Sequence, residues 1–155
     1  MPQAQIKPSD IAAEAKKIHL PKIIKSHPQS LIGSISYPEI SGLKLSAKVS
    51  CDKLRIAVIE GDAVDVALDW HDAERKNSGF GEKPSISRPA IPVVNMANEK
   101  RAGGDWESGS MAPEECLCRR STLVHTLVTP HPLSPERSHY PIATFGGIYS
   151  PSVGK

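Results

Sequence analysis

The chain has 155 residues, 39% of them hydrophobic and 23% charged, a balance typical of one globular domain rather than a disordered chain. Its net charge of +2 is too small to predict direct binding to DNA, and no apolar run approaches the ~18 residues that a membrane-spanning helix needs. Three cysteines and an N-terminus without a basic or apolar signal segment favour a cytoplasmic or nuclear protein without a disulfide framework.

The first predicted element is a helix over residues 9–26. A Ser-Asp pair at its start can cap it, and apolar residues recur at helical spacing along it. Pro21 is expected to break or kink this helix. The segment 27–48 carries scattered Pro, Gly and Ser, which predicts an extended connector with short strands.

The clearest predicted strand is Lys53–Glu60, in which apolar and other residues alternate. Asp62 follows it, and two roles for this residue stay open together. It can cap a helix that extends to Leu68 or Trp70, and it could reach the amino group of an adenine ring. The polar segment Glu74–Pro89 is then predicted to be a loop.

A second, shorter strand is predicted at Ile91–Met96, followed by a Gly-rich stretch and a helix over Pro113–Val128. Pro113 suits the first helical position, where its missing N–H is not needed. A proline-broken loop over 129–140 and a short turn or strand near the C-terminus complete the chain. The order of strand, helix, strand, loop and helix predicts an α/β domain.

The Gly-rich stretch AGGDWESGSMAPEE spans residues 102–115. It follows a predicted strand, and open α/β sheets bind ligands beyond the carboxyl ends of their strands. Gly103 and Gly104 would let a ligand approach the backbone, whose N–H groups can bind phosphate oxygens. The spacing matches neither a dinucleotide fingerprint nor a P-loop, and two glycines taken alone more often form a plain turn.

Glu114 and Glu115 could do general acid–base chemistry if burial raised the pKa of one of them. Adjacent helical residues point about 100° apart, so one carboxylate can face a reacting bond while its neighbour positions something beside it. The alternative is a plain helix start, because acidic residues there complement the helix dipole.

Two asparagines upstream, Asn95 and Asn98, can hydrogen-bond ribose hydroxyls, although asparagine in isolation more often caps a turn. Cys116 and Cys118 do not have zinc-finger spacing, and no metal site is predicted. Arg119, with the arginine that follows it, could hold a phosphate, but a solvated helix face is the more common arrangement for such a pair.

The order of these motifs is more specific than any one of them. Gly-Asp after a strand, then VVNMAN, AGGDWESGSMAPEE, LCRRSTL and YPIATFGGIYSPSV resemble the microbial-type poly(ADP-ribose) glycohydrolase family, a branch of the macrodomain fold. The resemblance covers Leu54–Val153, and AAEAKKIHLPKII resembles the helix before the core of that family. It implies an α/β fold with a partial macrodomain-like mixed sheet flanked by helices. Residues 1–48 would form a helical extension and connector, and 49–155 the N-terminal part of the catalytic domain.

The family hallmark is a triple glycine followed after a short spacer by Gln-Glu-Glu. By resemblance, Gly103 and Gly104 match the first two glycines of a phosphate-contacting loop. Glu115 would be the general acid that protonates the leaving oxygen of a ribose–ribose bond, Glu114 would orient the distal ribose, and Asn98 would contact that ribose. Such chemistry passes through an oxocarbenium-like state and uses a protonated carboxyl group, without a metal or redox cofactor.

The sequence departs from the hallmark in two positions and in length. Asp105 replaces the third glycine, where it would repel a diphosphate unless turned away, or accept a ribose hydroxyl. Pro113 replaces the glutamine. Family members continue beyond GGIYSPSV with a second phosphate loop and an adenine-stacking aromatic residue, so we expect a fragment or a reduced domain.

We therefore expect a glycohydrolase acting on poly(ADP-ribose) or ADP-ribose, free or attached to modified proteins. The alternatives are an ADP-ribose-binding module without turnover and an inactive fragment of such an enzyme.

Overall fold

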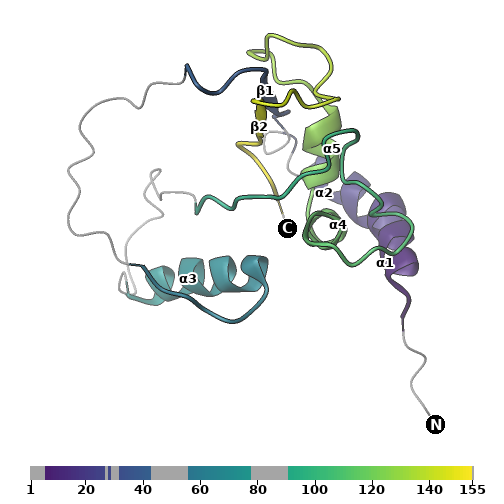
Figure 1. The fold of residues 1–155 in the computed structure, drawn as a ribbon. Coiled ribbons are helices and arrows are strands. Elements are labelled where there is room, and N and C mark those ends of the chain that lie inside the picture. Colours follow the sequence, from purple (N-terminus) through teal and green to yellow (C-terminus); the bar gives the residue numbers. More distant parts are fainter. Residues whose placement is uncertain (1–5, 27, 29–31, 43–55, 78–90, 155) are drawn as a thin grey trace. The chain divides into compact units, whose positions relative to one another are not determined.

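The computed structural model describes residues 6–26, 28, 32–42, 56–77 and 91–154. The chain divides into two compact units, one made of Met1–Lys44 with Asn95–Lys155 and the other of Leu45–Val94. The regular secondary structure of the described part consists of helices and one two-stranded sheet (Figure 1), which is compatible with the predicted α/β class. A larger mixed sheet is not found among these residues. None of the helices described is long and apolar enough to cross a membrane.

The predicted N-terminal helix is confirmed, with a different start. It consists of α1 (Pro8–Glu14), a π-helical segment η1 (Ala15–His19) and α2 (Leu20–Ser26). The N-cap is Lys7, without a side-chain cap bond, so the expected Ser-Asp cap is wrong. Pro8 takes the first turn because a residue there needs no N–H partner within the helix.

Pro21 does not break the helix, and the kink predicted as the alternative stays a prediction. The helix continues to Ser26, and the π-helical turns of η1 lie directly before the proline. Hydrogen bonds in a π-helix reach five residues back and widen the turn, which relieves the clash between a proline ring and the preceding turn.

Short strands occur in both segments where they were expected. β1 (Ile35–Tyr37) pairs antiparallel with β2 (Gly147–Tyr149), and Ser36 lies opposite Ile148. The sheet is fixed to the end of α5 through Ser34, whose N–H donates to the carbonyl oxygens of Thr126, at 3.1 Å, and of the C-cap residue Thr129, at 2.9 Å. Figure 1 shows the strand pair next to that end of α5.

The two longer predicted strands are wrong where the structure describes them. Residues 56–60 and 91–96 have no strand conformation, and the Val58 side chain is 98% exposed. Residues 53–55 lie outside the described part. A strand needs a neighbour for its N–H and C=O groups, and no described residue pairs with either segment.

Helix α3 (Ala63–Asn77) is longer than predicted. Asp62 caps it, because its carboxylate accepts the N–H groups of Val64 at 2.9 Å and Asp65 at 3.2 Å. The helix runs on through Glu74–Asn77, the start of the predicted polar loop, so that part of the prediction is wrong. The rest of the predicted loop to Pro89 falls outside the described residues.

The helix predicted over residues 113–128 is divided in two. α4 (Pro113–Arg120) begins with proline in its first turn, as predicted, and α5 (Leu123–Val128) follows after a break. At the break, the Thr122 N–H donates to the Gly154 carbonyl and the Gly154 N–H donates to the Thr122 hydroxyl, both at 2.8 Å. The C-terminal segment thereby replaces the intrahelical bonds that a continuous helix would have made.

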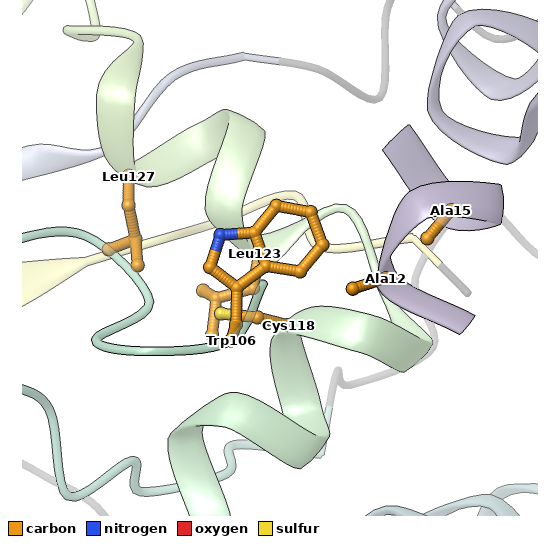
Figure 2. Packing of buried hydrophobic residues seen from close by; sticks show 6 residues of the cluster. All are labelled: Ala12, Ala15, Trp106, Cys118, Leu123 and Leu127. Carbon is orange, nitrogen blue, oxygen red and sulfur yellow. The ribbon is translucent and has the colours of Figure 1, made fainter. Parts of the chain in front are cut away.

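The hydrophobic core of the larger unit joins the N-terminal helix to the Gly-rich stretch. Figure 2 shows the indole ring of Trp106 packed among the core side chains, with Ala12 of α1 beside it. Trp106 is 5% exposed and Ala12 only 1%. An ion pair between Lys16 and Glu107, at 3.0 Å, lies at the edge of this contact. The cluster comprises Ala12, Ala15, Trp106, Cys118, Leu123 and Leu127.

We expect Ala12→Leu to destabilise the chain, because the small side chain is what lets α1 approach the indole ring. Overpacking of a full core typically costs about 1–3 kcal/mol. The exposed neighbour Ala13 offers a matched control, and Ala13→Leu should change the free energy of unfolding by less than ~0.5 kcal/mol. Urea unfolding of both variants measures the difference, and equal stabilities would contradict this packing.

Candidate active site

The site is formed where the loop from Asn95 to Asp105 meets the first turn of α4. Glu114 and Glu115 both lie in that turn, where carboxylates complement the helix dipole. Both are nonetheless buried, at 2% and 8% exposure. Because a buried carboxylate is costly without hydrogen bonds, the partners of the two groups define the site.

Glu114 is held by backbone N–H groups of the loop. Its Oε2 accepts the N–H of Asn98 at 2.7 Å, and its Oε1 lies 3.5 Å from the Asn95 side-chain amide. Burial raises the pKa of Glu114, and the negative charge of Glu115 adds to this. Hydrogen bonds from the backbone of Asn98 and Gly103 act in the opposite direction and lower it.

Glu115 has a different set of partners. Its Oε1 accepts the backbone N–H of Asp105 at 3.1 Å. No hydrogen bond joins its Oε2 to any residue that the structure describes. The buried Glu115 carboxyl group therefore keeps one oxygen for another partner.

Gly104 lies against both carboxyl groups. A Cβ at this position would be 2.5 Å from Glu115 Oε1 and 3.5 Å from Glu114 Oε2, and the residue has φ +53°. Gly103, at φ +73°, is likewise too crowded for a side chain, because a Cβ there would meet the Trp106 ring at 2.9 Å. Both positions thus require glycine for space and for backbone conformation.

The Asp105 side chain is exposed, unlike the buried glutamates. Its carboxylate forms an ion pair with Arg101, and both side chains are more than half exposed. The Asn98 side chain supports this turn by accepting the N–H groups of Lys100 at 2.8 Å and Arg101 at 3.1 Å. The repulsive carboxylate that the sequence raised as a concern is therefore paired with a cation of the same loop.

Arg119 is a structural residue that sequence reasoning placed wrongly. It is 7% exposed, whereas a solvated face or a phosphate contact was expected. Its guanidinium donates to the carbonyl oxygens of Trp106 at 3.0 Å and Ser110 at 2.5 Å. These bonds fasten the loop after Asp105 to α4, so Arg119 is occupied within the protein.

Tyr140 begins the motif YPIATFGGIYSPSV, but the sequence assigned it no role. Its hydroxyl is buried and makes no hydrogen bond within the described part of the chain. Burial raises its pKa, and the charges of Glu114 and Cys118 raise it further. Cys118 is fully buried, and burial above all raises the pKa of its thiol to about 12, which makes it an unreactive core residue.

Most predicted site residues come together. Asn95, Asn98, the two glycines, Asp105 and both glutamates belong to the larger unit and are connected by the bonds above. Asp62 belongs to the other unit, so its contact with adenine stays a prediction. Among the described residues, no three His, Cys, Asp or Glu side chains form a group that could hold a metal ion.

A cavity of about 690 Å³ lies elsewhere in the larger unit. Residues of the N-terminal helix line it, together with Arg119, Ser121 and Gly154. Neither glutamate contributes to its lining, so it is separate from the buried carboxylates.

Comparison with known proteins decides the family. The family model for the catalytic domain of microbial-type PARG, a poly(ADP-ribose) glycohydrolase, matches residues 11–154. The chain belongs to this family. Neither a curated protein nor a solved structure matches it.

Membership in the microbial-type PARG family connects the site to a glycosyl hydrolase class with poly(ADP-ribose) as the implied substrate. The match includes most of the N-terminal helix as well as the Gly-rich loop and α4. The buried glutamates and the helix that packs on Trp106 therefore fall inside one matched region.

We expect Gly104→Ala to impair activity much more than it impairs folding. A non-glycine residue at positive φ costs about 1–2 kcal/mol, while the new methyl group would displace the Glu115 carboxyl group. Poly(ADP-ribose) cleavage should fall at least ~100-fold, as misplaced catalytic groups typically cause. Gly42→Ala is the control, because a Cβ there meets no atom within 4 Å. Full activity of the Gly104 variant would contradict the geometry.

Stability should depend on pH through Glu114. Its pKa is raised from 4.5 in the folded chain, so at pH values between the unfolded and folded pKa the folded chain holds a proton that the unfolded chain has lost. Stability therefore falls as pH rises through that window. Glu114→Gln should lack this fall, so in urea unfolding its stability relative to the parent chain should increase as pH rises above about 4.5. A constant difference would argue against the raised pKa.

Proposed function

We propose that the chain hydrolyses the ribose–ribose O-glycosidic bonds of poly(ADP-ribose). In this proposal Glu115 is the general acid that protonates the leaving oxygen. Glu114 orients the distal ribose, with Asn98 as a further contact to that sugar. Departure of the protonated leaving group would pass through an oxocarbenium-like state, which water then captures.

The observation that carries the assignment is the unequal engagement of the two glutamates. A general acid needs an oxygen that can reach the leaving group. Oε2 of Glu115 has no hydrogen-bond partner among the described residues, whereas Glu114 accepts hydrogen bonds from the backbone of Asn98 and Gly103. Glu115 can thus turn to a substrate, while Glu114 is held in place beside it.

The fold and setting belong to the same proposal. A macrodomain-like catalytic domain over 49–155, preceded by a helical extension over 1–48, would supply a sugar and diphosphate site at this loop. The substrate would be polymer, ADP-ribose or a modified protein in the cytoplasm or nucleus. The alternative of binding without turnover is favoured by Asp105 and Pro113, which replace the family's third glycine and its glutamine.

Glu115→Gln should abolish release of ADP-ribose from labelled polymer, with a loss of about 10²–10⁴-fold, the usual contribution of a positioned general acid. The amide cannot donate the proton, but its oxygen can still accept the Asp105 N–H, so the fold should persist. Added ADP-ribose should still raise the melting temperature of the variant.

Glu107→Gln is the matched control, because Glu107 is an exposed glutamate of the same loop and should keep full activity when changed. A fully active Glu115→Gln variant would overturn the assignment. ADP-ribose binding with no polymer cleavage by the parent chain would establish the binding-module alternative instead.

A further inference from the structure

The backbone N–H groups of the glycine turn are used within the protein. The backbone of Gly103 bonds to Glu114, and the Asp105 N–H donates to Glu115. The Gly104 N–H donates to the carbonyl of Arg101 at 3.3 Å, and the Trp106 N–H donates to the Gly103 carbonyl at 3.1 Å. Four successive donors that a diphosphate would use are therefore already engaged.

Positive charge at the same turn comes from side chains instead. Lys100 and Arg101 follow each other on the exposed side of the loop, and their N–H groups are fixed by the Asn98 side chain. Arg101 lies four residues before Asp105, which it meets in an exposed ion pair. Arginine presents several N–H donors in a planar fork and suits phosphate oxygens well.

Resting on the proposed function, we propose that Arg101 is a diphosphate-binding residue and that Asp105 competes with the ligand for it. In the free chain the Asp105 carboxylate occupies the guanidinium. When ADP-ribose binds, Arg101 exchanges this carboxylate for a phosphate oxygen of the ligand. The pair is exposed, and exposed ion pairs typically contribute little to stability, so the exchange costs little.

This arrangement gives a physical role to Asp105, which replaces the third glycine of the family hallmark. A carboxylate in place of the third glycine does not abolish the phosphate site, since it is neutralised by a cation of the same loop. It lowers the affinity of the site for phosphate by an amount that corresponds to the strength of one exposed ion pair. Asp105 thus sets the affinity for ADP-ribose without contacting the sugar.

The test is calorimetric titration of the full chain with ADP-ribose at low salt. Asp105→Asn should bind about 3- to 5-fold more tightly, the ratio that an exposed ion pair of this strength represents. Arg101→Gln should bind about 10-fold more weakly, as expected when a charge-assisted bond to phosphate is lost. The double variant should bind like Arg101→Gln, because Asp105 acts only through Arg101.

Glu107→Gln is the matched control for charge. Glu107 lies in the same loop, is 58% exposed against 57% for Asp105, and also takes part in an ion pair. Its change to glutamine alters net charge by the same amount and should leave ADP-ribose affinity unchanged. Equal gains from Asp105→Asn and Glu107→Gln would overturn the proposal, since they would reveal a general charge effect.

Other outcomes separate this proposal from the proposed function. If the parent chain binds ADP-ribose and Arg101→Gln binds equally well, Arg101 is not a ligand residue and only the present inference fails. If Asp105→Asn tightens binding even without Arg101, direct repulsion replaces competition and the inference is again wrong. If neither the parent chain nor Asp105→Asn binds ADP-ribose, both proposals fail. Binding of ADP-ribose by Asp105→Asn but not by the parent chain would give the inference its strongest support.

Discussion

The burial of two adjacent carboxylates at the start of α4 is the constraint on which the site depends. Glu114 and Glu115 can be buried only because loop N–H groups reach them. Those groups reach them only if the chain turns tightly beside both carboxyl groups, and a side chain at Gly104 would occupy the space of the Glu115 carboxylate. Gly104 is therefore explained by the glutamates of this protein, and Gly103 by the Trp106 ring, before any ligand is considered.

The loop keeps this shape because Trp106 attaches it to the core and Arg119 attaches it to α4. Trp106 inserts into the core against the N-terminal helix, and Arg119 binds the carbonyl oxygens of Trp106 and Ser110. The N-terminal helix thus supports the site through one aromatic side chain. A buried guanidinium is costly when left without acceptors. Displacing the loop would remove the acceptors of Arg119, so the position of the loop is coupled to the packing of the core.

Local signals in the sequence predicted much of the helical structure. Pro113, the N-terminal apolar spacing and Asp62 each act within a few residues, and the helices that they mark are present. The predictions of strands at 56–60 and 91–96 were wrong because a strand depends on a partner that its own sequence does not specify. Motif order located the glutamates and glycines. It could not locate Trp106 or the inward direction of Arg119, since both depend on the path of the loop in space.

The two adjacent glutamates differ in what holds their carboxyl groups. Burial raises the pKa of Glu114, and hydrogen bonds from the backbone of Asn98 and Gly103 oppose that rise. Glu115 has the oxygen without a partner among the described residues. Because neighbouring helical residues point in different directions, the turn can hold one carboxyl group firmly while the other stays available. The N–H groups of the loop set this balance without contacting a substrate, so changes in loop geometry alter the chemistry of both glutamates together.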